Sequence, residues 1–118
     1  MIKCEINKMA GSIDEKFVKK IVKDIFKILK IQKASISVAI VDKKTIRKLN
    51  KKYRKKDEVT DVLSFEELNE IIIEESETKD KKNLKKLLAH SILHLLGHRH
   101  GEKMFGLQKK ICSKLKEL

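Results

Sequence analysis

The hydrophobic pattern of this chain changes its period several times, and the order of these changes constrains the fold more than any single motif. Residues 2–7 and 34–41 alternate between apolar and polar positions, as strands do. Between them, from Ser12 onward, apolar residues recur every three or four positions, which is typical of an amphipathic helix. Ser12 and Asp14 are both suitable N-cap residues for that helix. The first third of the chain therefore predicts a strand, a helix and a second strand.

The middle of the chain continues this alternation. Asp42 offers an N-cap for a short helix, and residues 62–65 and 70–75 have the composition of two further strands. The polar stretch between the helix and these strands is expected to be a loop. The inward positions of the short helix are expected to be Ile46, Leu49 and Tyr53.

Two helices end the chain. The first begins near Asp80 and is expected to stop at Gly97, because glycine is usual just past a helix end. The second begins near Glu102. The buried positions of the two helices are predicted to be Leu84, Leu87, Leu88, Ser91, Ile92 and Leu95, and then Met104, Leu107, Ile111, Leu115 and Leu118. The whole order predicts an α+β fold, with residues 1–118 as one small domain in which about four helices pack on a mixed sheet of about four strands.

The charge is strongly unbalanced, with 29 Lys and Arg against 17 Asp and Glu and a formal net charge of +12. Such a charge favours a polyanionic partner such as RNA, although lysine is also a common surface residue. Cys4 and Cys112 lie far apart without a CxxC spacing, so a reducing compartment is expected. The sequence contains no apolar run of membrane-spanning length and no signal-like start, which predicts a cytoplasmic protein without a membrane partner.

All four histidines lie within residues 90–100. His90 and His94 are four positions apart on a predicted helix, so their imidazoles leave the same face and can hold one Zn²⁺. After the turn at Gly97, either His98 or His100 could supply a third ligand. Three histidine ligands would leave one position open for a water, as a catalytic zinc site requires. Ser91 stands where the peptidase signature HExxH has its glutamate, which disfavours a peptidase of that type.

A second polar patch, YRKKDEVTDVLSF, occupies residues 53–65. Arg54 is one of only three arginines in a lysine-rich chain, and a guanidinium binds phosphate in a bidentate way. The alternative interpretation is a solvated basic loop in which Asp57 and Asp61 balance the charge.

Together the two patches resemble the YbeY family of bacterial endoribonucleases that mature rRNA. The family signature H-G-x-L-H-L-x-G-Y-D-H corresponds to HSILHLLGHRH here, and Y-R-x-K-D-x-P-T-D-V-L-S-F-P corresponds to YRKKDEVTDVLSFE. The resemblance implies His90, His94 and His100 as zinc ligands, with His98 in the place of the tyrosine. Arg99 stands at the position of the family's aspartate, and Ser91 at that of a glycine.

The resemblance further implies a zinc-protease-like site on a helix and a zinc-dependent endoribonuclease specific for single strands. Its expected work is maturation of the 3′ end of 16S rRNA and ribosome quality control, with rRNA and the small ribosomal subunit as partners. Arg54 is expected to stabilise charge on the phosphate. Lys55, Lys56 and Arg99 are candidates for substrate binding, and Asp57 and Asp61 are candidates for the general base.

Two other functions remain open from the sequence. One is a non-catalytic ribosome-associated factor whose zinc is structural, and the other is a metal-dependent peptidase. The few aromatic residues, Phe17, Phe26, Tyr53, Phe65 and Phe105, fall mostly on expected buried faces. Base stacking is therefore expected to contribute little to RNA binding.

Overall fold

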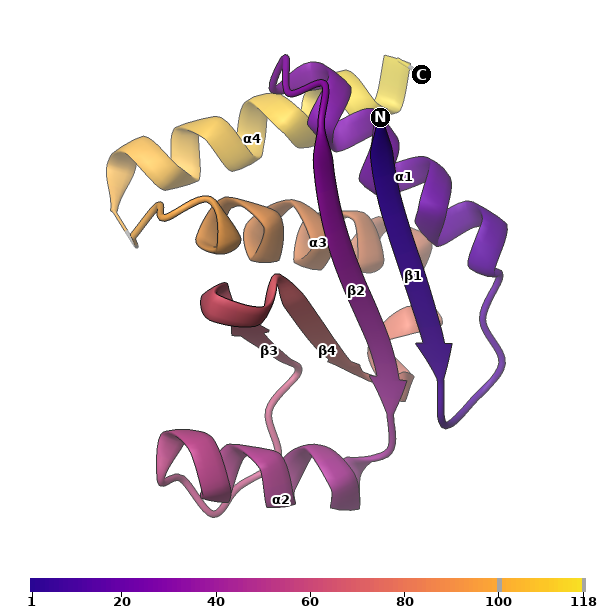
Figure 1. Ribbon diagram of the computed structural model, residues 1–118, viewed down its shortest axis with the longest axis vertical. Helices are drawn as coiled ribbons and strands as arrows, with labels where there is room; N and C mark the ends of the chain where they lie inside the picture. Colours follow the sequence, from indigo (N-terminus) through magenta and orange to yellow (C-terminus); the bar gives the residue numbers. More distant parts are fainter. Residues whose placement is uncertain (100, 118) are drawn as a thin grey trace.

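The computed structural model describes residues 1–99 and 101–117 and consists of one sheet with helices on both of its faces (Figure 1). The strands and helices, in chain order, are β1 (Ile2–Lys8), α1 (Glu15–Ile28), β2 (Ala34–Val41), α2 (Lys43–Arg54), β3 (Val62–Phe65), β4 (Glu70–Glu74), α3 (Lys81–Leu95) and α4 (Glu102–Glu117). Two short 3-10 turns, η1 (Glu66–Leu68) and η2 (Glu75–Thr78), flank β4. The predicted order of elements and the α+β fold are confirmed.

The sheet is mixed, with strand order β1-β2-β4-β3. Strands β1, β2 and β4 run parallel, whereas β3 pairs antiparallel with β4 from Val62 opposite Ile73 to Phe65 opposite Glu70. The link between β3 and β4 is only η1 and Asn69, which takes a left-handed conformation at φ 49°. So short a link permits only an antiparallel pairing, because parallel neighbours require a long crossover.

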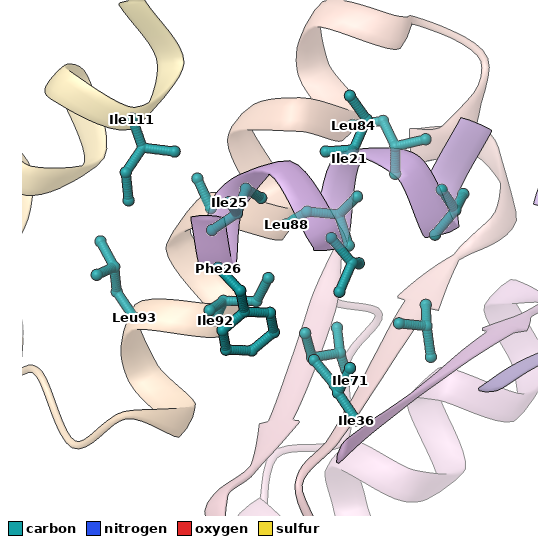
Figure 2. Close-up of a cluster of buried hydrophobic side chains, with 14 of the residues drawn as sticks. Ile21, Ile25, Phe26, Ile36, Ile71, Leu84, Leu88, Ile92, Leu93 and Ile111 are labelled. Carbon is teal, nitrogen blue, oxygen red and sulfur yellow. The ribbon is translucent and has the colours of Figure 1, made fainter. Parts of the chain in front are cut away.

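Helices α1, α3 and α4 cover one face of the sheet, and α2 covers the other (Figure 1). The larger core lies on the three-helix side, where isoleucines of β2 and β4 meet apolar residues of the helices (Figure 2). Helix α3 contacts β3, β4, α1 and α4, so it is buried on more than one side. For this reason Ala89 and Leu93 are buried as well as the predicted Leu84, Leu88 and Ile92.

The smaller core under α2 contains Ile46, packed against Leu63 and Phe65 among others. Leu49 packs at its edge, as expected. The prediction that Tyr53 points inward is wrong, because this residue is 51% exposed. Its ring instead meets the Phe65 ring edge-on, with 5.4 Å between the centroids, and covers the edge of this core from outside.

An aspartate caps the N-terminus of three of the helices. Asp14 caps α1, Asp42 caps α2 and Asp80 caps α3, in each case by accepting a hydrogen bond from a backbone N–H of the first turn. Of the two residues expected at the start of α1, Asp14 is therefore the N-cap. The hydrogen bonds from Thr45 favour the ionised carboxylate and hold the pKa of Asp42 below its usual value.

Glu74 at the end of β4 anchors the link that leads into α3. Its side chain is buried and accepts hydrogen bonds from Ser76 and from the ammonium of Lys43. Burial acts to raise the pKa of Glu74, but the hydrogen bonds from Ser76 and Lys43 outweigh it and the pKa is lowered. The start of α3 is thus tied to the sheet.

Leu118, predicted to end the buried stripe of α4, lies outside the described residues. Within the described part of the chain, no helix has both the length and the apolar composition that crossing a bilayer requires.

Candidate active site

A pocket of about 560 Å³ lies between the C-terminal half of α3 and the β3 side of the sheet. Both polar patches of the sequence contribute to it. Its lining residues are Arg54, Asp61, Val62, Leu63, Ser64, Glu66, Glu67, His90 and His94. Segments that are separated by some thirty positions along the chain therefore meet in one concave site.

His90 and His94 form the helical wall of this pocket. They stand one turn apart on α3 and are half-buried, as the flank of an apolar stripe requires. Their ring centroids are 4.6 Å apart at an interplanar angle of 80°, and their Nε2 atoms approach to 3.1 Å. The two Nε2 atoms are therefore within hydrogen-bond distance of each other, and close enough to bind the same ion.

Gln108 of α4 fixes the orientation of His90. Its Oε1 lies 2.8 Å from His90 Nδ1, and an amide oxygen only accepts, so Nδ1 carries the proton. The lone pair of the neutral ring is then on His90 Nε2, the atom that faces His94. Gln108 is itself only 8% exposed, which holds its amide in place.

This pair fits a metal ion. Two nitrogen ligands of one tetrahedral Zn²⁺, each at about 2.0–2.1 Å, stand about 3.3 Å apart. The observed Nε2 separation of 3.1 Å is close to that value. A histidine that binds a metal through one ring nitrogen usually donates a hydrogen bond from the other nitrogen to a nearby oxygen. For His90, that oxygen belongs to the Gln108 amide.

The turn after α3 decides where the remaining histidines lie. Gly97 adopts φ 90°, its N–H donates to the carbonyl of His94, and the N–H of His98 donates to the carbonyl of Leu93. This pair of bonds is a Schellman motif, which ends the helix at the predicted glycine. His98 therefore no longer shares the helix face of His90 and His94, and it does not line the pocket.

Within residues 1–99 and 101–117, no group of three or more His, Cys, Asp or Glu side chains is arranged to hold a metal ion. His98 therefore does not complete the pair formed by His90 and His94. His100, the third predicted ligand, lies outside the described residues, and its role stays a prediction.

Arg54 belongs to the other wall of the pocket. It is the last residue of α2, and its Nη2 donates to the carbonyl of Ser64 on β3 at 2.8 Å. Its Cζ lies 5.0 Å from the centroid of the Phe65 ring, within the range of a cation–π contact. Among the described residues it forms no ion pair.

Three carboxylates, those of Asp61, Glu66 and Glu67, line the same pocket. Asp57 does not; it pairs with Arg47 at 2.8 Å on the surface, and the hydrogen bond from Arg47 lowers its pKa. Of the two carboxylates considered as bases, only Asp61 therefore lines the pocket of the histidine pair.

Lys55, Lys56 and Arg99 are exposed and stand outside the lining of the pocket. Lys55 caps α2 in a left-handed conformation at φ 60°. The N–H of Lys56 donates to the carbonyl of Asn50. Their proposed contact with substrate stays a prediction.

Gln108, Glu66 and Glu67 were not anticipated from the sequence. Gln108 did leave a signal, because it occupies the buried face of α4 between Met104 and Ile111, where an apolar residue is expected. A polar side chain at a core position needs a buried partner, and here that partner is His90. Glu66 and Glu67 lie in a short turn that has no repeating pattern of apolar residues, so the sequence did not indicate which way their side chains point.

Comparison with known proteins gives a consistent result. Residues 2–116 match the family model described as Endoribonuclease YbeY. The chain is 36% identical to the Endoribonuclease YbeY of a Sulfurihydrogenibium species, over 93% of this chain and 90% of that protein. It is 34% identical to the same-named protein of Persephonella marina, over 94% and 91% of the two chains. The solution structure of TM1509 from Thermotoga maritima superposes with a TM-score of 0.66 at 26% identity, covering 98% of this chain and 89% of that one.

Proposed function

Because this chain belongs to the YbeY family, we propose that it is an endoribonuclease that cleaves single-stranded RNA in the pocket between α3 and β3. The observation that carries the proposal is the meeting of two adjacent imidazoles with a guanidinium that forms no ion pair with any described residue, all in one pocket. Imidazoles are suited to a metal ion and a guanidinium to a phosphate, and hydrolysis of a phosphodiester uses both.

His90 and His94 are proposed to hold a single Zn²⁺, with His100 as the third ligand. When bound, the metal supplies a Lewis acid that polarises a phosphoryl oxygen and makes a water more acidic. The separation of the Nε2 atoms and the hydrogen bond from His90 to Gln108 support this assignment. The carboxylates of Asp61, Glu66 and Glu67 also favour a cation in the pocket, because they outnumber the single guanidinium.

Arg54 has the role of stabilising negative charge as it grows on the phosphate during attack. Its bond to the Ser64 carbonyl and its contact with the Phe65 ring orient the guanidinium while leaving other N–H donors for the substrate. Asp61, which lines the pocket, is the proposed acceptor of a proton from the attacking water.

In the cell, the proposed task is maturation of the 3′ end of 16S rRNA and quality control of ribosomes, on rRNA and the small subunit in the cytoplasm. Membership of the YbeY family and the net charge of +12 support an RNA partner.

Cleavage of a labelled single-stranded RNA by the zinc-loaded protein tests this function. Arg54→Ala is expected to lower the cleavage rate by about 10²–10³, as loss of a charge-stabilising donor does. Arg47→Ala is the matched control, because Arg47 is on the same helix but pairs with Asp57 outside the pocket. Equal cleavage by the wild type and Arg54→Ala would contradict the proposed role of Arg54.

The same samples separate the two competing functions. A peptidase would cleave an unstructured protein such as casein, and lysine substitutions would not change that rate. A non-catalytic factor with structural zinc would lose its helical circular dichroism on removal of the metal and would cleave no RNA. The proposed enzyme is expected to stay folded without zinc, because its core of helices and sheet is independent of the histidines.

A further inference from the structure

A second groove, of about 520 Å³, runs between α3 and α4 and differs sharply in charge from the pocket. Five lysines line it: Lys82, Lys85 and Lys86 from α3, and Lys109 and Lys116 from α4. No carboxylate belongs to its lining among the described residues. The groove therefore combines a mostly apolar surface with five positively charged side chains, between two packed helices.

This groove leads directly to the histidine pair. Lys82, Lys86, His90 and His94 follow one another at intervals of four positions on α3, so they form one ridge of the helix, with a rise of about 6 Å between successive members. Gln108 lines the groove and also hydrogen-bonds to His90. A lining residue of the groove is thus hydrogen-bonded to a lining residue of the pocket.

The groove also contains an aromatic surface. Phe105, at the start of α4, lines it and is 56% exposed. The sequence predicted little stacking surface because most aromatic residues were expected to be buried, but Phe105 lies where a base beside the backbone path can stack on it. Base–aromatic stacking accepts any base, because each has a π face.

The pocket by itself is poorly suited to attract RNA. Three carboxylates and one guanidinium line it, so a polyanion gains little there from long-range attraction. Binding of RNA therefore requires basic surface close to the pocket, and the α3–α4 groove is such a surface.

We propose that the α3–α4 groove binds the single-stranded RNA that flanks the cleaved phosphodiester. Its lysines contact successive phosphates, Phe105 stacks on a base, and the ridge of α3 guides the strand to His90 and His94. The inference rests on the proposed function, because it locates the substrate of the same site. Contacts between phosphates and lysines release condensed counterions, so this binding depends steeply on salt.

The test measures binding of a short fluorescent single-stranded RNA over a series of salt concentrations, with every variant made in the His94→Ala protein so that the RNA is not cleaved. For Lys82→Gln/Lys86→Gln, the slope of log affinity against log salt is expected to fall by about 1.4, because each lost contact with single-stranded RNA removes about 0.7. Lys44→Gln/Lys48→Gln is the matched control, since these lysines have the same spacing on α2, on the opposite face of the sheet. Equal losses in both variants would overturn the proposal.

Cys112 offers a second readout, because it lies in the groove. Burial raises the pKa of the Cys112 thiol and also that of Cys4 on β1, so the two thiols are matched in character. Bound RNA is expected to slow alkylation of Cys112 several-fold at mildly alkaline pH and to leave Cys4 unchanged. Alkylation of Cys112 at the same rate with and without saturating RNA would overturn the proposal.

The His94→Ala variant separates this inference from the function on which it rests. It is expected to bind RNA and protect Cys112 as the wild type does, while cleavage is lost. If the wild type cleaves RNA but the groove variants bind it normally, the proposal that the groove binds RNA is wrong, whereas the proposed endoribonuclease function is unaffected. If the wild type neither binds nor cleaves single-stranded RNA, both proposals fail.

Discussion

The two walls of the pocket are built in different ways. On the helical wall, His90 and His94 are half-buried, belong to one regular helix, and are supported from behind by Gln108 of α4. On the strand wall, Arg54 is exposed at the end of α2 and is oriented by one backbone carbonyl and one aromatic face. The helical wall is therefore partly buried and supported by a neighbouring helix, whereas the arginine of the strand wall is exposed to solvent.

This difference matches what each wall is proposed to do. Metal ligands must hold their spacing closely, because metal–nitrogen distances tolerate little error, and a packed helix supplies that rigidity. A phosphate-binding arginine needs free N–H donors near the position where negative charge develops. The exposed Arg54 guanidinium has such donors besides the one bonded to the Ser64 carbonyl. Substitutions on the two walls should therefore differ in size and in kind.

The largest effect is expected on the helical wall itself. His94→Ala removes one of two adjacent nitrogens, so zinc affinity should fall by more than about 100-fold, beyond the usual loss from a supporting residue. His98→Ala is the matched control, since His98 lies past the Schellman turn and outside the pocket. Zinc content after gel filtration and competition with a chelator measure both. Equal loss in the two variants would mean that the pair is not the metal site.

A smaller effect is expected behind the same wall. Gln108→Leu keeps the size of the side chain but removes the acceptor for His90 Nδ1, so the ring no longer has a fixed tautomer. Zinc affinity should fall by about 10–100-fold, the usual loss when such a partner is removed.

Nitrogen chemical shifts of the His90 ring in the metal-free protein report the tautomer directly. They should change in Gln108→Leu, while the urea unfolding midpoint shows that the fold persists. Unaltered shifts would mean that Gln108 merely fills space.

On the strand wall, removing the residue that supports Arg54 is expected to have a smaller effect than removing Gln108. Phe65→Leu removes the aromatic face under the guanidinium, and an exposed cation–π contact contributes about 0.5–1 kcal/mol. The cleavage rate should fall by about 2–5-fold. Phe26→Leu, a buried phenylalanine of the other core, controls for the general cost of a smaller side chain. A loss as large as that of Arg54→Ala would show that the strand wall is as rigid as the helical one.

The smallest effect on the site is expected inside α3, where a substitution should change stability alone and in the favourable direction. Ser91 is fully buried, and among the described residues its hydroxyl has no hydrogen-bond partner. Ser91→Ala should therefore raise the free energy of unfolding by about 1 kcal/mol, measured by urea denaturation, with zinc affinity unchanged. A destabilised Ser91→Ala variant would point to a hydrogen bond of this hydroxyl with water or metal-bound groups.

Local features of the sequence were sufficient for much of this molecule. The periods of its apolar residues predicted each strand and helix in order, the aspartates marked the helix starts, and Gly97 marked the end of α3. The spacing of His90 and His94 predicted a shared face, because that geometry is contained within one helix. Each of these features depends on residues close together along the chain.

Other features were decided only by the tertiary structure. Tyr53 has the right spacing to point inward, yet α2 ends at the edge of its small core and the ring stays exposed. Gln108 meets His90 only because α4 packs against α3. Arg54, at the end of α2, shares a pocket with the histidines only because β3, to which it is hydrogen-bonded, packs against α3. These contacts join segments from different elements, so they depend on how helices and strands pack, which the period of a single segment does not encode.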